Sequence, residues 1–261
     1  MAEQNLKIIK IGGNIMNSDI ALNSFLKDFS NLSGPKILVH GGGKKATDMS
    51  SKLGLKPKMI GGRRLTDRAT LEVVTMVYAG LLNKKLTAIL QKNGCNAIGL
   101  SGADANCVTA HKRILKDIDY GFAGDIDQVN TDSIQVFIQN GMTPVFCAIT
   151  HDKKGQLLNT NADTIASELA IAMSNVYEVE LNYIFDLPGV LEIFNNRDSV
   201  IPHINKKKYE QLIEKKTISD GMIPKLHNCF NALKSGVQKV NIGDASLIKG
   251  LDNLYTSLSL K

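Results

Sequence analysis

The strongest constraint on this fold is the alternation of short apolar runs with longer amphipathic segments. Runs of strand length occupy residues 6–11, 36–40, 96–100, 143–149 and 178–185, and most of the segments between them show helical spacing. The runs are almost continuously apolar, which is typical of parallel strands that are covered on both faces. The pattern therefore predicts an α/β protein with a largely parallel sheet between layers of helices.

Helical spacing predicts helices over residues 19–31, 132–140, 161–173 and 226–234, and one long helix, continuous or broken, over residues 66–93. Glycines follow several of the strands, at positions 12–13, 41–43, 102 and 189. Right-handed crossovers bring the carboxyl ends of parallel strands to one edge of the sheet, where open α/β folds bind their ligands. We therefore expect the glycine turns to form a binding site at that edge.

Charge and cysteine content argue against several classes of protein. The formal charge is +6, but the cations are scattered, tryptophan is absent and aromatic residues make up 5% of the chain. Base-stacking platforms are therefore not indicated, and a pocket for a small polyanion accounts for the charge as well as a solvated surface does. Four widely spaced cysteines and five unpaired histidines predict no zinc site. Without a signal peptide or an apolar run of ~18 residues, we expect a soluble cytoplasmic protein that binds neither nucleic acid nor membrane.

The residues after the second strand form a glycine turn with the sequence HGGGKKA, at positions 40–46. The turn fits the loose dinucleotide fingerprint, but the acidic residue expected about 20 positions further on is missing. The spacing does not fit a Walker loop either. Backbone N–H groups of a glycine turn at a helix N-terminus point toward an anion, so we interpret the segment as an anion cradle. A plain strand-to-helix turn is the simpler alternative.

Charged residues with no simple structural reason lie near the same edge. Lys10 ends the first strand, where burial requires an anionic partner unless the strand lies at an edge. Asn161 is suited to cap a helix that carries Asp163 in its first turn. Lys225 follows Pro224 at a helix N-terminus, where a cation opposes the helix dipole. Two lysines, one carboxylate and glycine turns, without a nucleophilic elbow or a histidine base, indicate phosphoryl transfer.

These motifs together resemble the N-acetylglutamate kinases of the amino-acid kinase (carbamate kinase-like) family. The resemblance runs over nearly the whole chain in the family's order and is carried by IKIGG at 9–13, VHGGG at 39–43, GRRLT at 62–66, NTNAD at 159–163 and DGMIPK at 220–225. It implies a three-layer αβα sandwich with an open, mostly parallel central sheet. It also implies ATP-dependent phosphorylation of the γ-carboxylate of N-acetyl-L-glutamate, or a close N-acyl-glutamate such as N-succinyl, in arginine biosynthesis.

The resemblance also implies roles for individual residues. Lys10 and Lys225 would stabilise the transferring phosphoryl group, and Asp163 would hold both lysines in place. The substrate would be bound by Gly42, Gly43, Arg64 and Asn159. The resemblance places the acyl-glutamate and dimerisation lobe at residues 1–172 and the ATP lobe at residues 173–261. Mg²⁺ would be carried by ATP without a protein metal site, and ATP would contact Gly12, Gly13, Asp186, Leu187, Pro188, Gly189, Val190, Leu191, Thr217, Ile218 and Ser219.

Two positions depart from the family pattern. Arg63 replaces an apolar residue, which places a further cation beside the substrate arginine and points to a larger or more anionic acyl group, such as succinyl. Leu187 and Pro188 replace the usual Val-Ser, which removes a hydroxyl and a backbone donor from the nucleotide turn. Arginine-inhibited hexameric members carry a helix before the first strand, and Lys10 comes too early to leave room for one. We therefore expect a homodimer, insensitive to arginine, that pairs through residues 66–93.

Three other functions remain open at this point. Another kinase of the family could act on a different carboxylate or a nucleoside monophosphate, although the motifs at Arg64 and Asn159 argue against nucleotide kinases. The glycine turn alone would suit a dinucleotide-binding oxidoreductase. A ligand sensor that keeps the fold would bind without transferring phosphate, but Lys10, Asp163 and Lys225 are all present.

Overall fold

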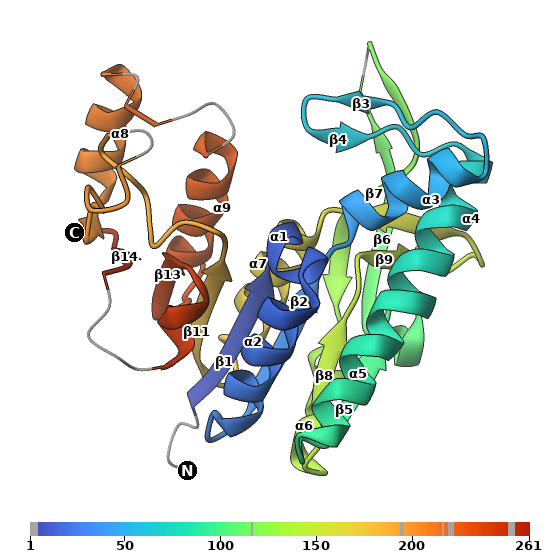
Figure 1. Cartoon of the computed structure of the whole chain (residues 1–261), viewed down its shortest axis with the longest axis horizontal. Helices are drawn as coiled ribbons and strands as arrows, with labels where there is room; N and C mark the ends of the chain where they lie inside the picture. The colour runs from blue at the N-terminus through green and yellow to red at the C-terminus, as the bar shows by residue number, and fades with distance from the viewer. Residues whose placement is uncertain (1–4, 116, 194–195, 216, 219–221, 250–253) are drawn as a thin grey trace.

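The computed structural model describes residues 5–115, 117–193, 196–215, 217–218, 222–249 and 254–261. Its centre is an eight-stranded sheet (Figure 1). In spatial order the strands are β12 (His203–Ile204), β14 (Thr256–Leu258), β13 (Lys239–Gly243), β11 (Glu178–Ile184), β1 (Asn5–Ile11), β2 (Lys36–His40), β8 (Thr143–Phe146) and β5 (Ala97–Leu100). Every neighbouring pair is parallel except β13 and β14. The expected open, mostly parallel sheet is confirmed.

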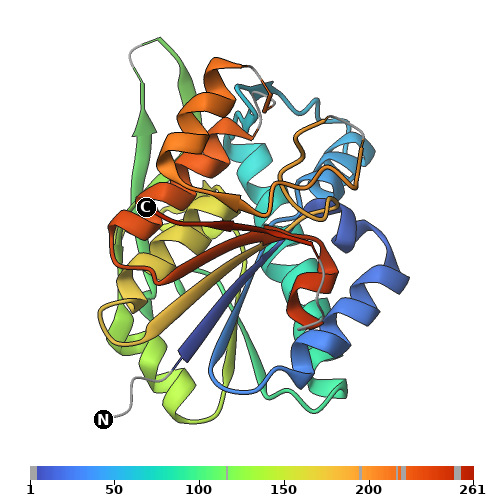
Figure 2. The same ribbon diagram turned by 90° about the vertical axis from the view of Figure 1, so that its left-hand side faces the viewer.

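Helices cover both faces of this sheet, as the side view shows (Figure 2). One face carries α1 (Gly13–Asn17), α2 (Asp19–Asn31), α3 (Gly43–Lys52), α4 (Arg68–Thr75), the π-helical η1 (Met76–Leu82), α5 (Asn83–Lys92) and the 3₁₀ helix η3 (Ala245–Lys249). The other face carries α6 (Thr131–Gln139), α7 (Ala162–Met173) and α9 (Ile223–Lys234), with α8 (Lys206–Glu214) beside α9. The three-layer αβα sandwich is thus confirmed.

The long helix over Arg68–Lys92 follows the expected helix at residues 66–93 closely. It begins after Asp67, whose carboxylate accepts a hydrogen bond from the Thr70 N–H. By length and composition this helix could cross a membrane. In the fold, however, α5 packs against β5, β8 and α2, and buries side chains such as Leu86 and Leu90. It is therefore a helix of the core.

The structure corrects the expected strand at 143–149. After β8 the chain leaves the main sheet at Cys147 and Ala148 and forms β9 (Ile149–His151). This strand belongs to a second, small closed sheet with β6 (Val108–Ile114), β7 (Asp119–Val129) and β10 (Leu157–Thr160). A short hairpin of β3 (Met59–Ile60) and β4 (Arg63–Arg64) lies next to β7, to which the chain after β4 is joined by a bridge between Thr66 and Gly121. The 3₁₀ turn η2 (Asp104–Asn106) precedes β6. The second sheet was not expected from the sequence.

The carboxyl ends of the central strands lie level with one another. Ile11 at the end of β1 is in register with His40 of β2 and Ile184 of β11. The glycine turn after β1, the glycine turn after β2 and the turn after β11 therefore meet at one edge, as the crossover rule predicted. The strands of residues 173–261 continue the same sheet, because β11 pairs directly with β1.

A close backbone approach at Gly121 joins the second sheet to the segment that carries Arg64. Gly121 has a φ of +67°, and a Cβ built on it would lie 2.1 Å from the Thr66 carbonyl oxygen. Gly54 has a similar φ of +75°, but a Cβ there would meet nothing within 4 Å. A substitution at Gly54 therefore tests the cost of the positive φ alone, whereas one at Gly121 adds a steric clash with the Thr66 backbone.

We predict that Gly54→Ala lowers the free energy of unfolding by about 1 kcal/mol, the cost of a left-handed conformation alone. Gly121→Ala should lower it by on the order of 3 kcal/mol, because the backbone at Thr66 must also move. Urea unfolding with linear extrapolation measures both values. Equal losses in the two variants would contradict the close packing of β7 on the Thr66 segment.

Candidate active site

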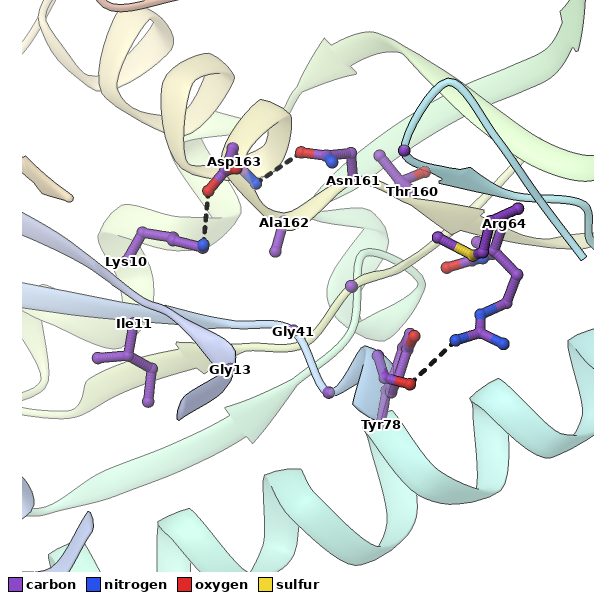
Figure 3. Close-up of a pocket in the computed structure, with 16 residues that line it drawn as sticks. Lys10, Ile11, Gly13, Gly41, Arg64, Tyr78, Thr160, Asn161, Ala162 and Asp163 are labelled. Atoms are coloured by element: carbon purple, nitrogen blue, oxygen red, sulfur yellow. Dashed lines mark hydrogen bonds and ion pairs between the residues drawn. The ribbon is translucent and has the colours of Figure 1, made fainter. Parts of the chain in front are cut away.

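A pocket of about 250 Å³ opens at the carboxyl edge of the sheet (Figure 3). It is bordered by the ends of β1 and β2, the first turns of α3 and α7, β4, β10 and one turn of η1. Figure 3 shows Lys10 and Asp163 on one side, Arg64 on the other, and Gly41 between them. Its lining residues are Lys10, Ile11, Gly13, Gly41, Gly42, Gly43, Met59, Gly62, Arg64, Tyr78, Ala148, Asn159, Thr160, Asn161, Ala162 and Asp163.

An ion pair joins the central strand β1 to helix α7. The Lys10 Nζ lies 2.6 Å from the Asp163 Oδ1, and the two side chains are only 10% and 16% exposed. Strand β1 lies between β2 and β11, so Lys10 is not at a sheet edge. Such a buried cation requires a counter-ion, and Asp163 provides it.

Asp163 is held at the start of α7 by a capping interaction. The Asn161 side chain accepts hydrogen bonds from the N–H groups of Asp163 and Thr164, at 2.8 and 3.1 Å. The Tyr183 hydroxyl donates to the Asp163 carbonyl at 3.1 Å. Asn161 is thus an N-cap, as the simpler interpretation of its position predicted, and it also lines the pocket.

Lys225, which lies in α9, approaches the Lys10–Asp163 ion pair. Its Nζ lies 3.9 Å from the centre of the Phe185 ring, and the Lys10 Nζ lies 5.0 Å from the same centre. Burial lowers the pKa of Lys225, while the negative charge of Asp163 acts in the opposite direction. Lys225 is not among the residues that border the pocket, but the ring of Phe185 and the charge of Asp163 link it to Lys10.

Packing at Gly42 fixes the glycine turn after β2. A Cβ at Gly42 would lie 2.4 Å from Leu82 and 2.9 Å from Tyr78, and its φ is +154°. Only glycine allows η1 to approach this closely. Gly42 caps α3, whose first N–H groups have no acceptor within the helix. Gly42 and Gly43 both line the pocket, so the start of α3 lies at its edge.

Arg64 is buried at the pocket wall with one guanidinium nitrogen engaged. Its Nη2 donates to the Gly43 carbonyl at 2.9 Å and to the Thr47 hydroxyl at 2.8 Å. Its Nη1 is buried and has no hydrogen-bond partner among the described residues. An unpaired buried donor is costly, so a ligand acceptor at this point would be stabilising. The Asn159 amide, also at the pocket, donates to the Thr66 hydroxyl at 3.0 Å, and this hydroxyl donates to the Arg64 carbonyl at 3.0 Å.

Three pocket residues, Tyr78, Met59 and Ala148, were missed by the sequence argument. Tyr78 and Met59 reach the pocket from η1 and β3. Tyr78 lies in an apolar helical stretch and is 5% exposed, so its position matched that of a core residue. Met59 is 55% exposed and lies in a two-residue strand. In none of the three cases did the residue type or its spacing in the sequence indicate a pocket residue.

Arg63 does not border the pocket, contrary to its expected place beside the substrate arginine. As a neighbour of Arg64 in β4, its side chain points to the opposite face of that strand. Burial lowers the pKa of Arg63, the nearby positive charge of Arg113 lowers it further, and Asp125 opposes both. These neighbours place Arg63 against the β6–β7 hairpin, so it gives no support for a larger acyl group.

The residues expected to bind ATP are only partly brought to the pocket. Gly13 lines it, but the Gly12 N–H donates to the Ile184 carbonyl at 2.8 Å and is not free for a ligand. The exposed Asp186 accepts a hydrogen bond from the Asn14 side chain. Leu187, Pro188 and Thr217 are half-buried, whereas Gly189, Val190, Leu191 and Ile218 are buried. Ser219 lies outside the described residues, as do Asp220 and Gly221.

The buried part of that turn has a structural role. The Val190 N–H donates to the Thr256 hydroxyl at 2.8 Å, and the Val190 carbonyl accepts from the Ile201 N–H at 2.8 Å. A Cβ at Gly189 would lie 2.6 Å from the Thr256 hydroxyl oxygen. This turn is therefore fixed against β14, and only its half-buried and exposed residues are open to a ligand.

Comparison with known proteins agrees with this geometry. The model of the amino acid kinase family matches residues 5–244. The chain belongs to the amino acid kinase family. Acetylglutamate kinase of Cytophaga hutchinsonii is 53% identical over 259 residues, which cover 99% of this chain and 98% of that protein. Acetylglutamate kinase of Phocaeicola vulgatus is 49% identical over 94% of this chain and 96% of that protein.

Two solved structures have a similar fold. The crystal structure of smu.665 from Streptococcus mutans matches with a TM-score of 0.80 and 27% identity, over 98% of this chain and 99% of that one. Isopentenyl phosphate kinase matches with a TM-score of 0.63 and 17% identity over 97% of this chain and all of that one, which shows the fold alone. The resemblance to amino-acid kinases seen in the sequence is confirmed.

We predict that Asp163→Asn lowers the pKa of Lys225 below its value in the unaltered amino acid kinase, because Asp163 is the main charge that opposes the effect of burial. An NMR titration of protein labelled with ¹³C at the lysine Cε atoms measures this shift. Asp186→Asn serves as the control, since the charge of Asp186 contributes less to Lys225. A larger shift in the control would contradict the assignment of Asp163 as the shared counter-ion.

Proposed function

We propose that this amino acid kinase transfers the γ-phosphoryl group of ATP to the γ-carboxylate of N-acetyl-L-glutamate, a step of arginine biosynthesis. Full-length relatives named acetylglutamate kinase support the substrate. The main structural support is that one pocket is lined both by Arg64, whose Nη1 has no partner among the described residues, and by the Lys10–Asp163 ion pair. One end suits a carboxylate and the other suits a transferring phosphate.

The reaction needs no general base, because the attacking carboxylate is already ionised. A carboxylate oxygen forms a bond to the γ-phosphorus, the bond to the bridging oxygen breaks, and its electron pair leaves with ADP. The two anions repel each other, so catalysis consists of positioning and charge neutralisation. In this proposal Lys10 and Lys225 contact the transferring group, Asp163 fixes both lysines, and the N–H groups of Gly42 and Gly43 complete the cradle.

Two polar side chains of the pocket would orient the substrate. Arg64 would bind the α-carboxylate through its free nitrogen, and Asn159 would bind the acyl amide. Because Arg63 faces away from the pocket, acetyl is favoured over succinyl as the acyl group. We assign acyl-glutamate binding to residues 1–172 and ATP binding, through Asp186, Leu187 and Pro188, to residues 173–261. Mg²⁺ would be carried on the ATP phosphates, and a cytoplasmic location remains a prediction.

The substrate proposal is tested with ATP, Mg²⁺ and hydroxylamine, which converts an acyl phosphate to a coloured hydroxamate. We predict product with N-acetyl-L-glutamate, less with N-succinyl-L-glutamate and little with free glutamate. Among the described residues that line the pocket the cations are Lys10 and Arg64, and neither is left for a succinyl carboxylate. Absence of product with all three would reject the proposal. NADH binding without ATP turnover would instead favour an oxidoreductase, and ligand binding without turnover would favour a sensor.

We predict that Lys10→Gln and Lys225→Gln each lower kcat by roughly 10²–10³-fold, because each removes a cation that neutralises charge in the transition state. Lys36→Gln is the matched control: Lys36 is also a buried lysine, but its Nζ donates to the Ser30 and Leu32 carbonyls far from the pocket. Steady-state kinetics with both substrates measures the effects. A rise in KM with unchanged kcat would limit the two lysines to substrate binding.

We also propose a homodimer that pairs through the helix at residues 68–92. Two apolar side chains of η1 support this face: Met76 is 55% exposed and Leu81 is 47% exposed. We predict a dimer in sedimentation velocity that Met76→Glu and Leu81→Glu together dissociate, since charges at an apolar contact remain unpaired. Val136→Glu, at an equally exposed apolar residue of α6, should leave the dimer intact. A hexamer, or a monomer before substitution, would contradict this proposal.

A further inference from the structure

A buried histidine stands directly before the glycine turn. His40 ends β2 and is fully buried, and it is not among the residues that line the pocket. Its Nδ1 lies 2.8 Å from the Gly41 carbonyl oxygen, and its Nε2 lies 3.1 Å from the Asn83 amide nitrogen. Neither the proposed reaction nor the substrate contacts described above use this ring.

The neighbours of Asn83 determine where the histidine proton lies. The Asn83 amide nitrogen donates to the Val145 carbonyl at 2.9 Å, and a carbonyl can only accept. At the other end, Lys84 donates to the Asn83 Oδ1 at 3.3 Å. The amide is thereby fixed, and its second N–H faces the His40 Nε2, which must accept. The proton of the neutral ring is then on Nδ1 and is donated to Gly41.

The ring stays in this neutral form over the ordinary pH range. Burial lowers the pKa of His40 to about 4. A second proton would lie on Nε2, directly opposite the Asn83 amide donor. His40 is therefore a permanent hydrogen-bond donor to the glycine turn rather than an acid or base.

We propose that His40 is a positioning residue that sets the direction of the Gly42 N–H. In a planar trans peptide the carbonyl and the following N–H point in opposite directions. The Gly41 carbonyl turns toward the buried ring, so the Gly42 N–H turns to the pocket side, where no described residue accepts from it. Asn83 acts one step earlier, by selecting the tautomer. The expected effect on kcat rests on the proposed function, whereas the tautomer of His40 follows from its hydrogen bonds alone.

The imidazole is tested directly by NMR of protein with ¹⁵N-labelled histidine. We expect His40 to carry its proton on Nδ1, with no titration between about pH 5.5 and 8. Asn83→Leu should allow the other tautomer. An Nε2–H tautomer in the unaltered protein, or protonation within that range, would overturn the inference. This result is independent of kinase activity, so it remains decisive even if acyl phosphate is never formed.

The consequence for catalysis is tested with an isosteric pair of variants. His40→Leu removes the donor, whereas His40→Asn places an amide nitrogen near the position of Nδ1. We expect His40→Leu to lower kcat about 10–100-fold with little change in KM, and His40→Asn to restore most of it. Asn83→Leu should lower kcat when His40 is present. Combined with His40→Asn, it should have little further effect on kcat. Thermal unfolding of both position-40 variants checks the fold. Equal kcat values for Leu and Asn would overturn the positioning role.

Discussion

The ion pair between Lys10 and Asp163 is the interaction on which the rest of the site depends. Lys10 projects from a central strand and its side chain is only 10% exposed, and Asp163 stands in the first turn of a helix on one face of the sheet. Removing one partner of such a pair costs about 3–5 kcal/mol, because a buried charge is left alone. The pair thus fixes α7 to β1 and holds the Lys10 side chain at the pocket.

One short segment supplies several parts of the site at once. Asn159 in β10 lines the pocket, Asn161 caps α7, and Asp163 forms the ion pair with Lys10. On the opposite side, the glycine turn is held between η1, which excludes any side chain at Gly42, and the buried ring of His40. The donors of the cradle are therefore positioned before any ligand binds, which is the condition under which they favour a transition state.

The sequence predicted those features that depend on local chemistry. Strand runs, the helix at 19–31 and the N-cap at Asn161 follow from periodicity and from the short polar side chain at the cap, and the structure confirms them. The small closed sheet was missed because β9 follows β8 without a polar break, so the pattern showed one strand where the chain changes sheets. Tyr78 was missed because, in an apolar helical stretch, a residue that faces the core and one that lines a pocket occur at the same spacing. The direction of Arg63 follows from its alternation with Arg64 in β4, and no pattern in the sequence indicated that these two residues form a strand.

The account centres on direct transfer of phosphate to a carboxylate oxygen, and isotope labelling tests that bond. With N-acetyl-L-glutamate carrying ¹⁸O in its γ-carboxylate, ATP and Mg²⁺, the acyl phosphate formed should show an ¹⁸O-shifted ³¹P resonance. The shift reports that the bridging oxygen comes from the acceptor. Release of unlabelled inorganic phosphate alone, with no acyl phosphate resonance, would mean that water is the acceptor and would contradict the account.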